Sequence, residues 1–292
     1  MGSRYGGLAV RLAIYAGVLC GGLYFLQQRQ LYQPTPLPLA DAIAEGRAAG
    51  LAPWPSAQQY RGLVREPAEG AGVRATLVLF HGNAGHAAHR SEYAERLGAL
   101  GLRVILAEYP GYGPRTGEAS ESVLVGDGLE TLKIAHELYR GSLLLAGESL
   151  GAAVAAAVED AADRAGLRSD GLLLITPWDT LASAAKQHYP WLPVEWLLRE
   201  RYDTVQALAK RGLSRGPLAV VVADADAIVP AVLGRRLYER LPPPKRLFAL
   251  PRAGHNDWIE ATDERWWREL TEFLLGASIG EVTAPAKIQP PR

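Results

Sequence analysis

A serine between two glycines has the most specific chemical setting in this 292-residue chain. Gly147-Glu148-Ser149-Leu150-Gly151 follows an apolar run at 142–146 and opens an Ala-rich stretch at 150–165. A G-x-S-x-G pattern between a strand and a helix is typical of a serine held on a sharp, strained turn, with glycines that leave room for it. The helix end supplies free N–H groups and a positive dipole. The pattern predicts that Ser149 is a nucleophile; the alternative is an incidental serine in a glycine-rich turn.

A serine hydroxyl is a weak nucleophile that needs a base, and an imidazole base needs an acid that fixes its tautomer and stabilises its cation. Of the six histidines, only His255 follows the last expected strand, in a loop that faces the carboxyl edge of an open α/β sheet. Asp226 comes just after the apolar run 218–223, and Asp224 is its close competitor. We expect His255 to be the base and Asp226 to be the acid.

Two backbone N–H groups are expected to bind the oxyanion of a tetrahedral intermediate. One belongs to Leu150, directly after the serine. The other is expected in the loop His81-Gly82-Asn83-Ala84-Gly85, because its glycines let backbone amides approach the reacting oxygen. We expect the Asn83 N–H to be this second donor, with Ala84 as the adjacent alternative. Loss of one such donor raises a barrier by about 3 kcal/mol.

The other titratable residues near these motifs receive structural interpretations. The spacing of His81, His86 and His89 does not place all three on one helical face with a clear fourth ligand, so we expect no metal site there. His81 is expected to make a structural hydrogen bond beneath the oxyanion loop, whereas His86 and His89 are expected in an exposed first helical turn. We expect Glu148 to have a packing role and Asp257 to cap the helix that follows it.

Apolar runs alternate with helical patterns through most of the chain. The runs are apolar on both faces, as parallel strands covered by helices should be, and lie at 75–80, 102–107, 142–146, 171–175, 218–223 and 246–250. The helical segments between and after them are 86–99, 121–138, 150–165, 231–241 and 258–275. This alternation predicts an α/β fold with a doubly wound, mostly parallel sheet.

Other segments set the expected domain organisation. Residues 58–276 are expected to form the catalytic domain, and the polar, Trp-rich stretch 177–212 within it is either a short helical lid over a site or a set of extra surface helices. The proline-rich region 31–57 is expected to be a linker. The tail 277–292 lacks periodicity and is expected to be disordered.

The first 30 residues are expected to be an N-terminal membrane anchor. As a helix, the apolar stretch 6–26 reaches about 31 Å, one hydrocarbon thickness, with Arg11 as its single charged residue. No good cleavage site follows, which weighs against the alternative of a cleaved signal peptide; a buried soluble helix is a further alternative. Arg4 and Arg11 precede the apolar core of the span and Arg29 follows it, so we expect the amino terminus inside and the main domain outside.

Composition excludes several classes of protein. Lys plus Arg and Asp plus Glu both number 31, so the formal net charge is zero, which argues against a nucleic-acid binder. The single cysteine, Cys20, allows neither an intramolecular disulfide nor a cysteine-rich zinc site. The abundance of Ala, Arg and Gly suggests a GC-rich bacterial genome, in which case the outward-facing domain would be periplasmic.

These motifs together resemble the α/β-hydrolase superfamily, and more narrowly its single-span, membrane-anchored serine hydrolases. That group contains protein depalmitoylases and monoacylglycerol or lysophospholipid lipases. The resemblance covers about residues 28–276 and rests on QRQLYQP at 28–34, LFHGNAGHAAHR at 79–90, EYPGYGPRTGEASE at 108–121, GESLG at 147–151, DAIVP at 226–230 and GHND at 254–257.

The resemblance implies an α/β-hydrolase fold and a catalytic triad in the family's chain order, Ser149, Asp226 and then His255. It ranks Asp226 above Asp224, because Asp226 stands four residues before Pro230, as the family's acid does. Arg115 is a departure, because relatives often place a small residue after the Gly-Tyr-Gly turn, and this departure concerns the wall of an acyl pocket.

The sequence thus predicts a membrane-tethered serine hydrolase that cleaves carboxylic ester or thioester bonds through an acyl-enzyme, without a metal or organic cofactor. Its expected partners are an acyl ester or thioester substrate and the lipid bilayer, with no nucleic acid. Two alternatives stay open: a catalytically silent hydrolase fold used as a membrane-bound binding module, and a serine peptidase or acyltransferase. The oligomeric state is not predicted.

Overall fold

An eight-stranded sheet organises the computed structural model, which describes residues 11, 14–15, 17–18, 21–22, 24, 26–68, 70, 72–211 and 215–276. The strand order is β10-β9-β8-β7-β4-β6-β3-β2, in which the six strands from β10 to β6 run parallel and β3 and β2 are antiparallel to their neighbours. The strands are β2 Ala52–Trp54, β3 Gly62–Arg65, β4 Ala75–Phe80, β6 Leu102–Ala107, β7 Leu143–Glu148, β8 Gly171–Ile175, β9 Leu218–Ala223 and β10 Lys245–Leu250.

Apolar side chains on both faces of the central strands form two core layers. Along β4, Val78 and Phe80 point into one layer, whereas Leu77 and Leu79 point into the other, because successive side chains of a strand alternate between faces. The first layer packs against α4 Glu121–Leu138, α5 Leu150–Arg164 and α9 Ala231–Arg240. The second packs against α3 Ser91–Gly98 and α10 Glu264–Leu274. Helices therefore cover both faces, and the predicted α/β fold is confirmed.

The predicted elements agree closely with the observed ones. The expected strands 75–80, 102–107, 171–175 and 218–223 have the bounds of β4, β6, β8 and β9. The expected helix 86–99 is divided into the 3-10 helix η1 (Ala87–Arg90) and α3, and the expected helix 258–275 into η2 (Trp258–Ala261) and α10. The Asp263 side chain caps α10 by accepting a hydrogen bond from the Trp266 N–H, which explains the second break.

Residues 31–57 contain more regular structure than a linker. The short strand β1 (Gln33–Pro34) pairs in parallel with β5 (Ala84–Gly85), and helix α2 (Leu39–Ala48) follows it. Strand β2 then extends the main sheet by pairing with β3. Much of the segment expected to be a spacer therefore packs on the α/β domain.

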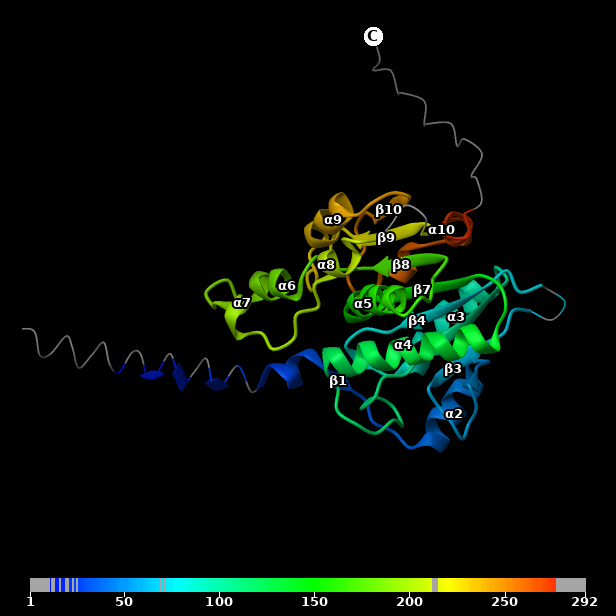
Figure 1. Cartoon of the computed structure of the whole chain (residues 1–292), viewed down its shortest axis with the longest axis horizontal. Helices are drawn as coiled ribbons and strands as arrows, with labels where there is room; N and C mark the ends of the chain where they lie inside the picture. The colour runs from blue at the N-terminus through cyan, green and yellow to red at the C-terminus, as the bar shows by residue number, and fades with distance from the viewer. Residues whose placement is uncertain are drawn as a thin grey trace, which may run out of the picture.

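The segment expected to be a lid contains three short helices, α6 (Leu181–His188), α7 (Val194–Leu197) and α8 (Thr204–Leu208). In Figure 1, α6 and α7 extend from the sheet on the same side as the described part of the blue N-terminal segment. The buried Trp178 ring fixes the start of the segment by donating a hydrogen bond from Nε1 to the Tyr202 carbonyl at 3.2 Å. Trp191 and Trp196, by contrast, are exposed.

The predicted anchor at 6–26 lies largely outside the described residues, and the predicted disordered tail 277–292 lies wholly outside them. Among the residues that are described, no helix combines the length and the apolar character needed to cross a bilayer. Residues 26–31 are helical and contact the lid segment, because Gln27 Nε2 donates to the Leu197 carbonyl at 3.0 Å and the Arg199 N–H donates to Gln27 Oε1 at 2.9 Å.

Candidate active site

Ser149 lies on the strained turn that its flanking glycines predicted. Its φ of 54° and ψ of −116° are unfavourable for a residue with a side chain. A Cβ on Gly147 would lie 1.9 Å from the Gly151 carbonyl oxygen, and a Cβ on Gly151 would lie 2.0 Å from the Phe80 carbonyl oxygen. Both positions must therefore be glycine for β7, the turn and α5 to pack as they do.

A chain of hydrogen bonds joins Ser149 to His255 and Asp226. His255 Nε2 lies 3.0 Å from Ser149 Oγ, and His255 Nδ1 lies 2.6 Å from Asp226 Oδ2. The three residues follow β7, β10 and β9, so the carboxyl edge of the sheet brings them together. Such an arrangement lets an imidazole take a proton from a serine hydroxyl while a carboxylate stabilises the resulting cation.

The Asp226 carboxylate is fixed on both oxygens. Oδ1 accepts hydrogen bonds from the Ile228 and Val229 N–H groups at 2.8 and 2.7 Å, which leaves Oδ2 for the imidazole. The side chain is 1% exposed, so these bonds are shielded from water. These hydrogen bonds therefore hold the Asp226 carboxylate in one orientation, with Oδ2 toward His255 Nδ1.

The competing aspartates have other partners. Asp224 pairs with Arg235 at 2.6 Å on the surface. The Asp257 side chain accepts a hydrogen bond from the Gly254 N–H at 2.6 Å and makes no cap bond to the helix after it. The expectation that Asp257 caps that helix is wrong: its carboxylate instead closes the tight loop that carries His255.

The expected oxyanion donors lie beside the serine. Asn83 and Leu150 line the same cavity as Ser149. Leu150 is the first residue of α5, so its N–H has no partner within the helix. The Asn83 carbonyl accepts hydrogen bonds from the Tyr112 hydroxyl at 2.8 Å and from the Gln33 N–H at 2.9 Å, which hold the loop in place.

The side chains of His81, Arg90 and Glu108 make further contacts that hold the loop bearing Asn83 and the serine turn. His81 is buried; its Nδ1 lies 2.8 Å from the Gly82 carbonyl and its Nε2 lies 3.2 Å from a Glu108 oxygen, in line with its expected structural role. Arg90 contacts Glu148 at 2.5 Å between Nε and Oε2 and thereby joins η1 to the serine turn. Arg90 and Glu108 were not singled out from the sequence, because lone charged residues carry no spacing signal.

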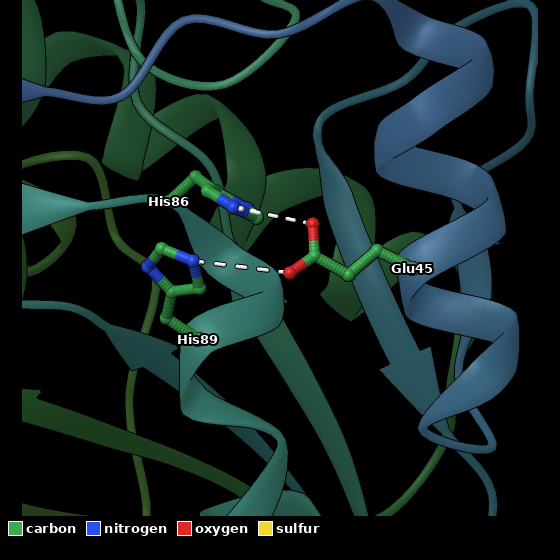
Figure 2. A group of neighbouring side chains, drawn as sticks. All are labelled: Glu45, His86 and His89. Atoms are coloured by element: carbon green, nitrogen blue, oxygen red, sulfur yellow. Dashed lines mark ion pairs between the residues drawn. The ribbon is translucent and has the colours of Figure 1, made fainter.

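His86 and His89 do not lie beside Ser149 in the cavity. Both face Glu45 of α2 instead (Figure 2). The expectation of an exposed helical turn is wrong for His86, which is 2% exposed, since it precedes η1 in extended conformation and its ring packs against that of His89.

An apolar cavity of about 300 Å³ opens at Ser149. Its lid wall includes Leu181, Ala185 and Leu192, and Leu31 of the N-terminal segment closes another side. Of the described residues that line it, none is acidic, and Arg115 is not among them because it pairs with Asp127. The remaining lining residues are Gln27, Gln30, Asn83, Leu150, Trp178, Ala184, His188, Tyr189, Val194, Leu197, Leu198, Ile228 and Val229.

The mostly parallel sheet and the serine on its strained strand-to-helix turn define the molecule as an α/β hydrolase. Residues 71–204 match the family Hydrolase_4, described as serine aminopeptidase, S33. Rv2307c, an uncharacterized protein of Mycobacterium tuberculosis, is 34% identical over 254 residues, which cover 84% of this chain and 87% of that protein. The chain therefore belongs to the Hydrolase_4 α/β-hydrolase family.

Two named proteins extend the comparison. Lysophosphatidylserine lipase ABHD12 of Danio rerio is 31% identical over 180 residues, which cover 56% of this chain and 46% of that protein. The solved structure of the Pyrobaculum calidifontis esterase superposes with a TM-score of 0.57 at 17% identity and covers 83% of this chain and 91% of that chain. The second similarity concerns the fold alone.

Proposed function

We propose that this protein is a serine hydrolase that cleaves carboxylic ester or thioester bonds of substrates with lipid-like acyl groups. The observation that carries the proposal is the hydrogen-bond chain from Ser149 Oγ through His255 to Asp226, with distances of 3.0 and 2.6 Å, together with the apolar cavity that Ser149 lines. The name of one similar protein, lysophosphatidylserine lipase ABHD12, supports the same reaction class.

In the proposed reaction, His255 Nε2 takes the proton from Ser149 Oγ as this oxygen attacks the carbonyl carbon. The carbonyl oxygen becomes an oxyanion that accepts hydrogen bonds from the Asn83 and Leu150 N–H groups. The tetrahedral intermediate then collapses, and the imidazolium gives its proton to the leaving alcohol or thiol. Water repeats the attack on the acyl-enzyme, with His255 again as base, and releases the carboxylic acid.

The character of the cavity supports an acyl substrate over a peptide. A peptidase that recognises a free amine terminus needs a negative group near the scissile bond, and the described lining residues include no carboxylate. Aliphatic and aromatic side chains instead offer a surface on which each buried methylene contributes about 0.8 kcal/mol. An acyl chain that extends from the serine therefore fits this cavity better than a charged terminus.

We further propose that the first 30 residues anchor the enzyme in a membrane, with the catalytic domain on the periplasmic side. The described residues of this stretch include exposed apolar side chains, Ile14, Val18 and Leu26, and the exposed Trp196 belongs to α7 on the same side of the molecule. Protease treatment of spheroplasts tests the topology: an outside domain is digested, whereas digestion only after lysis contradicts the proposal.

Labelling with a fluorophosphonate probe tests the reaction itself. The full chain should label and should hydrolyse para-nitrophenyl esters, and Ser149→Ala should abolish both while circular dichroism stays unchanged. Folded protein that neither labels nor hydrolyses any ester from acetate to palmitate would favour the silent binding module. Labelling that survives in Ser149→Ala would place the nucleophile elsewhere.

A further inference from the structure

Three side chains from two separate segments point toward one another (Figure 2), and none of them lines the cavity at Ser149. Glu45 comes from α2, His86 precedes η1 and His89 lies within η1. His86 Nε2 lies 3.4 Å from Glu45 Oε2, and His89 Nε2 lies 3.8 Å from Glu45 Oε1. One ligand atom from each of the three residues lies within 4.8 Å of the other two.

These separations suit a tetrahedral metal ion. Zinc binds imidazole nitrogen and carboxylate oxygen at about 2.0–2.2 Å, so two of its ligand atoms lie about 3.3 Å apart at the tetrahedral angle. The separations of 3.4 and 3.8 Å, each to a different oxygen of Glu45, and the limit of 4.8 Å among all three ligand atoms exceed this value by amounts that side-chain rotation can close. Glu45 and His89 are partly exposed, so they are free to make that movement, and solvent can supply a fourth ligand.

The surroundings favour a cation over extra protons. The two imidazole rings lie 3.9 Å apart between centroids, a distance at which two protonated rings repel strongly. A metal ion bound by both rings and the carboxylate would need no proton on either coordinating nitrogen.

The backbone of the preceding loop is shaped around one of these ligands. Gly85 has a φ of +87°, and a Cβ at this position would lie 2.5 Å from His89 Nδ1. A side chain at position 85 would therefore displace the His89 ring. The same loop carries Asn83, the proposed oxyanion donor, so a bond between η1 and α2 would hold the segment that follows this donor.

We propose that Glu45, His86 and His89 form a binding site for a divalent transition metal, Zn²⁺ in the first instance, that ties α2 to the loop bearing Asn83. Two imidazoles and one carboxylate select zinc or cobalt over magnesium and calcium, which prefer oxygen ligands. None of the three residues lines the cavity at Ser149, so the metal has a structural role in the loop and takes no part in the ester chemistry.

The test uses the full chain purified without a histidine tag, freed of metal with a chelator and dialysed against Zn²⁺ at pH 7.5. The wild type should retain one equivalent of zinc and melt at a higher temperature with Zn²⁺ than with Mg²⁺. Co²⁺ should give the visible absorption of a tetrahedral complex. Ser149→Ala should bind equally well, so the outcome does not depend on the proposed hydrolase activity.

The zinc affinity of the wild type is compared with that of variants at Glu45 and His89, because these two ligands are partly exposed. A change at buried His86 can disturb folding. His89→Ala and Glu45→Gln should each lower the zinc affinity at least about tenfold and remove the cobalt spectrum. His136→Ala changes an exposed histidine of α4 and should bind as the wild type does. The proposal is overturned if the wild type retains no zinc, which leaves an ion pair only, or if His89→Ala retains it fully.

Discussion

Replacing Asp226 by asparagine tests the proposed mechanism, because the hydrogen bonds around Asp226 determine which way the new amide group must point. Oδ1 accepts two hydrogen bonds, from the Ile228 and Val229 N–H groups, so the NH₂ of an asparagine cannot occupy that position without opposing two donors. The NH₂ must therefore take the place of Oδ2 and face His255 Nδ1. Nδ1 then has to accept a hydrogen bond, which moves the imidazole proton to Nε2.

An imidazole in that tautomer faces Ser149 Oγ with an N–H and cannot take its proton. Loss of the base in a triad through the wrong tautomer lowers kcat by about 10⁴, equal to about 5.5 kcal/mol of barrier. The variant should nevertheless fold, because the side-chain volume and the two bonds to Oδ1 are retained.

The assay is kcat/KM for para-nitrophenyl butyrate, with unfolding by urea as the check on stability. Asp224→Asn is the matched control, because Asp224 follows the same strand, β9, but pairs with Arg235 on the surface, and it should leave kcat/KM nearly unchanged. Activity of Asp226→Asn within tenfold of the wild type, or an equal loss in Asp224→Asn, would refute the assignment of the acid.

Three further perturbations test the cavity, the core and the loop. Ala185→Trp should lower kcat/KM for palmitate esters at least about tenfold and leave acetate within about twofold, whereas Gln187→Trp, outside the cavity lining, should change neither. Arg211→Met should reduce the free energy of unfolding in urea by about 3–5 kcal/mol, because it leaves the buried Glu159 carboxylate without its cation. Burial lowers the pKa of His86 below its ordinary 6.5 in the folded protein, so on acidification the His86 ring takes up a proton more readily in the unfolded chain than in the folded one. Metal-free protein should therefore lose stability as pH falls below about 6.5, and His86→Asn should flatten that slope in urea titrations.

Much of the fold was predictable because its central strands are buried on both faces. Runs such as 75–80 and 218–223 are buried at every residue and are apolar except for Thr76, and such runs have clear ends. The serine turn was equally readable, since only glycine fits at 147 and 151. Steric limits within the turn thus determine which residue types occur there, and the sequence shows them directly as the glycines of the G-x-S-x-G pattern.

Contacts between distant segments left no such signature. Glu45 meets His86 and His89 only because α2 packs beside η1, and nothing in the spacing of 81, 86 and 89 indicates the carboxylate. Leu31 likewise joins the cavity through the docking of the N-terminal segment on the lid. In both cases the partner is supplied by tertiary packing, which a pattern within one segment cannot encode.

The proline-rich stretch after residue 32 shows why a spacer and a strand are hard to distinguish. The Gln33 N–H of β1 donates a hydrogen bond to the Asn83 carbonyl at 2.9 Å, and the N–H of Thr35, the residue after β1, donates to the Gly85 carbonyl at 3.1 Å. Pro34 lies between these donors, at the position whose N–H would point away from β5, so its missing N–H costs the pair nothing. Extended, proline-bearing sequence is thus compatible with an edge strand, and here that strand connects the proposed membrane anchor to the loop that carries the proposed oxyanion donor.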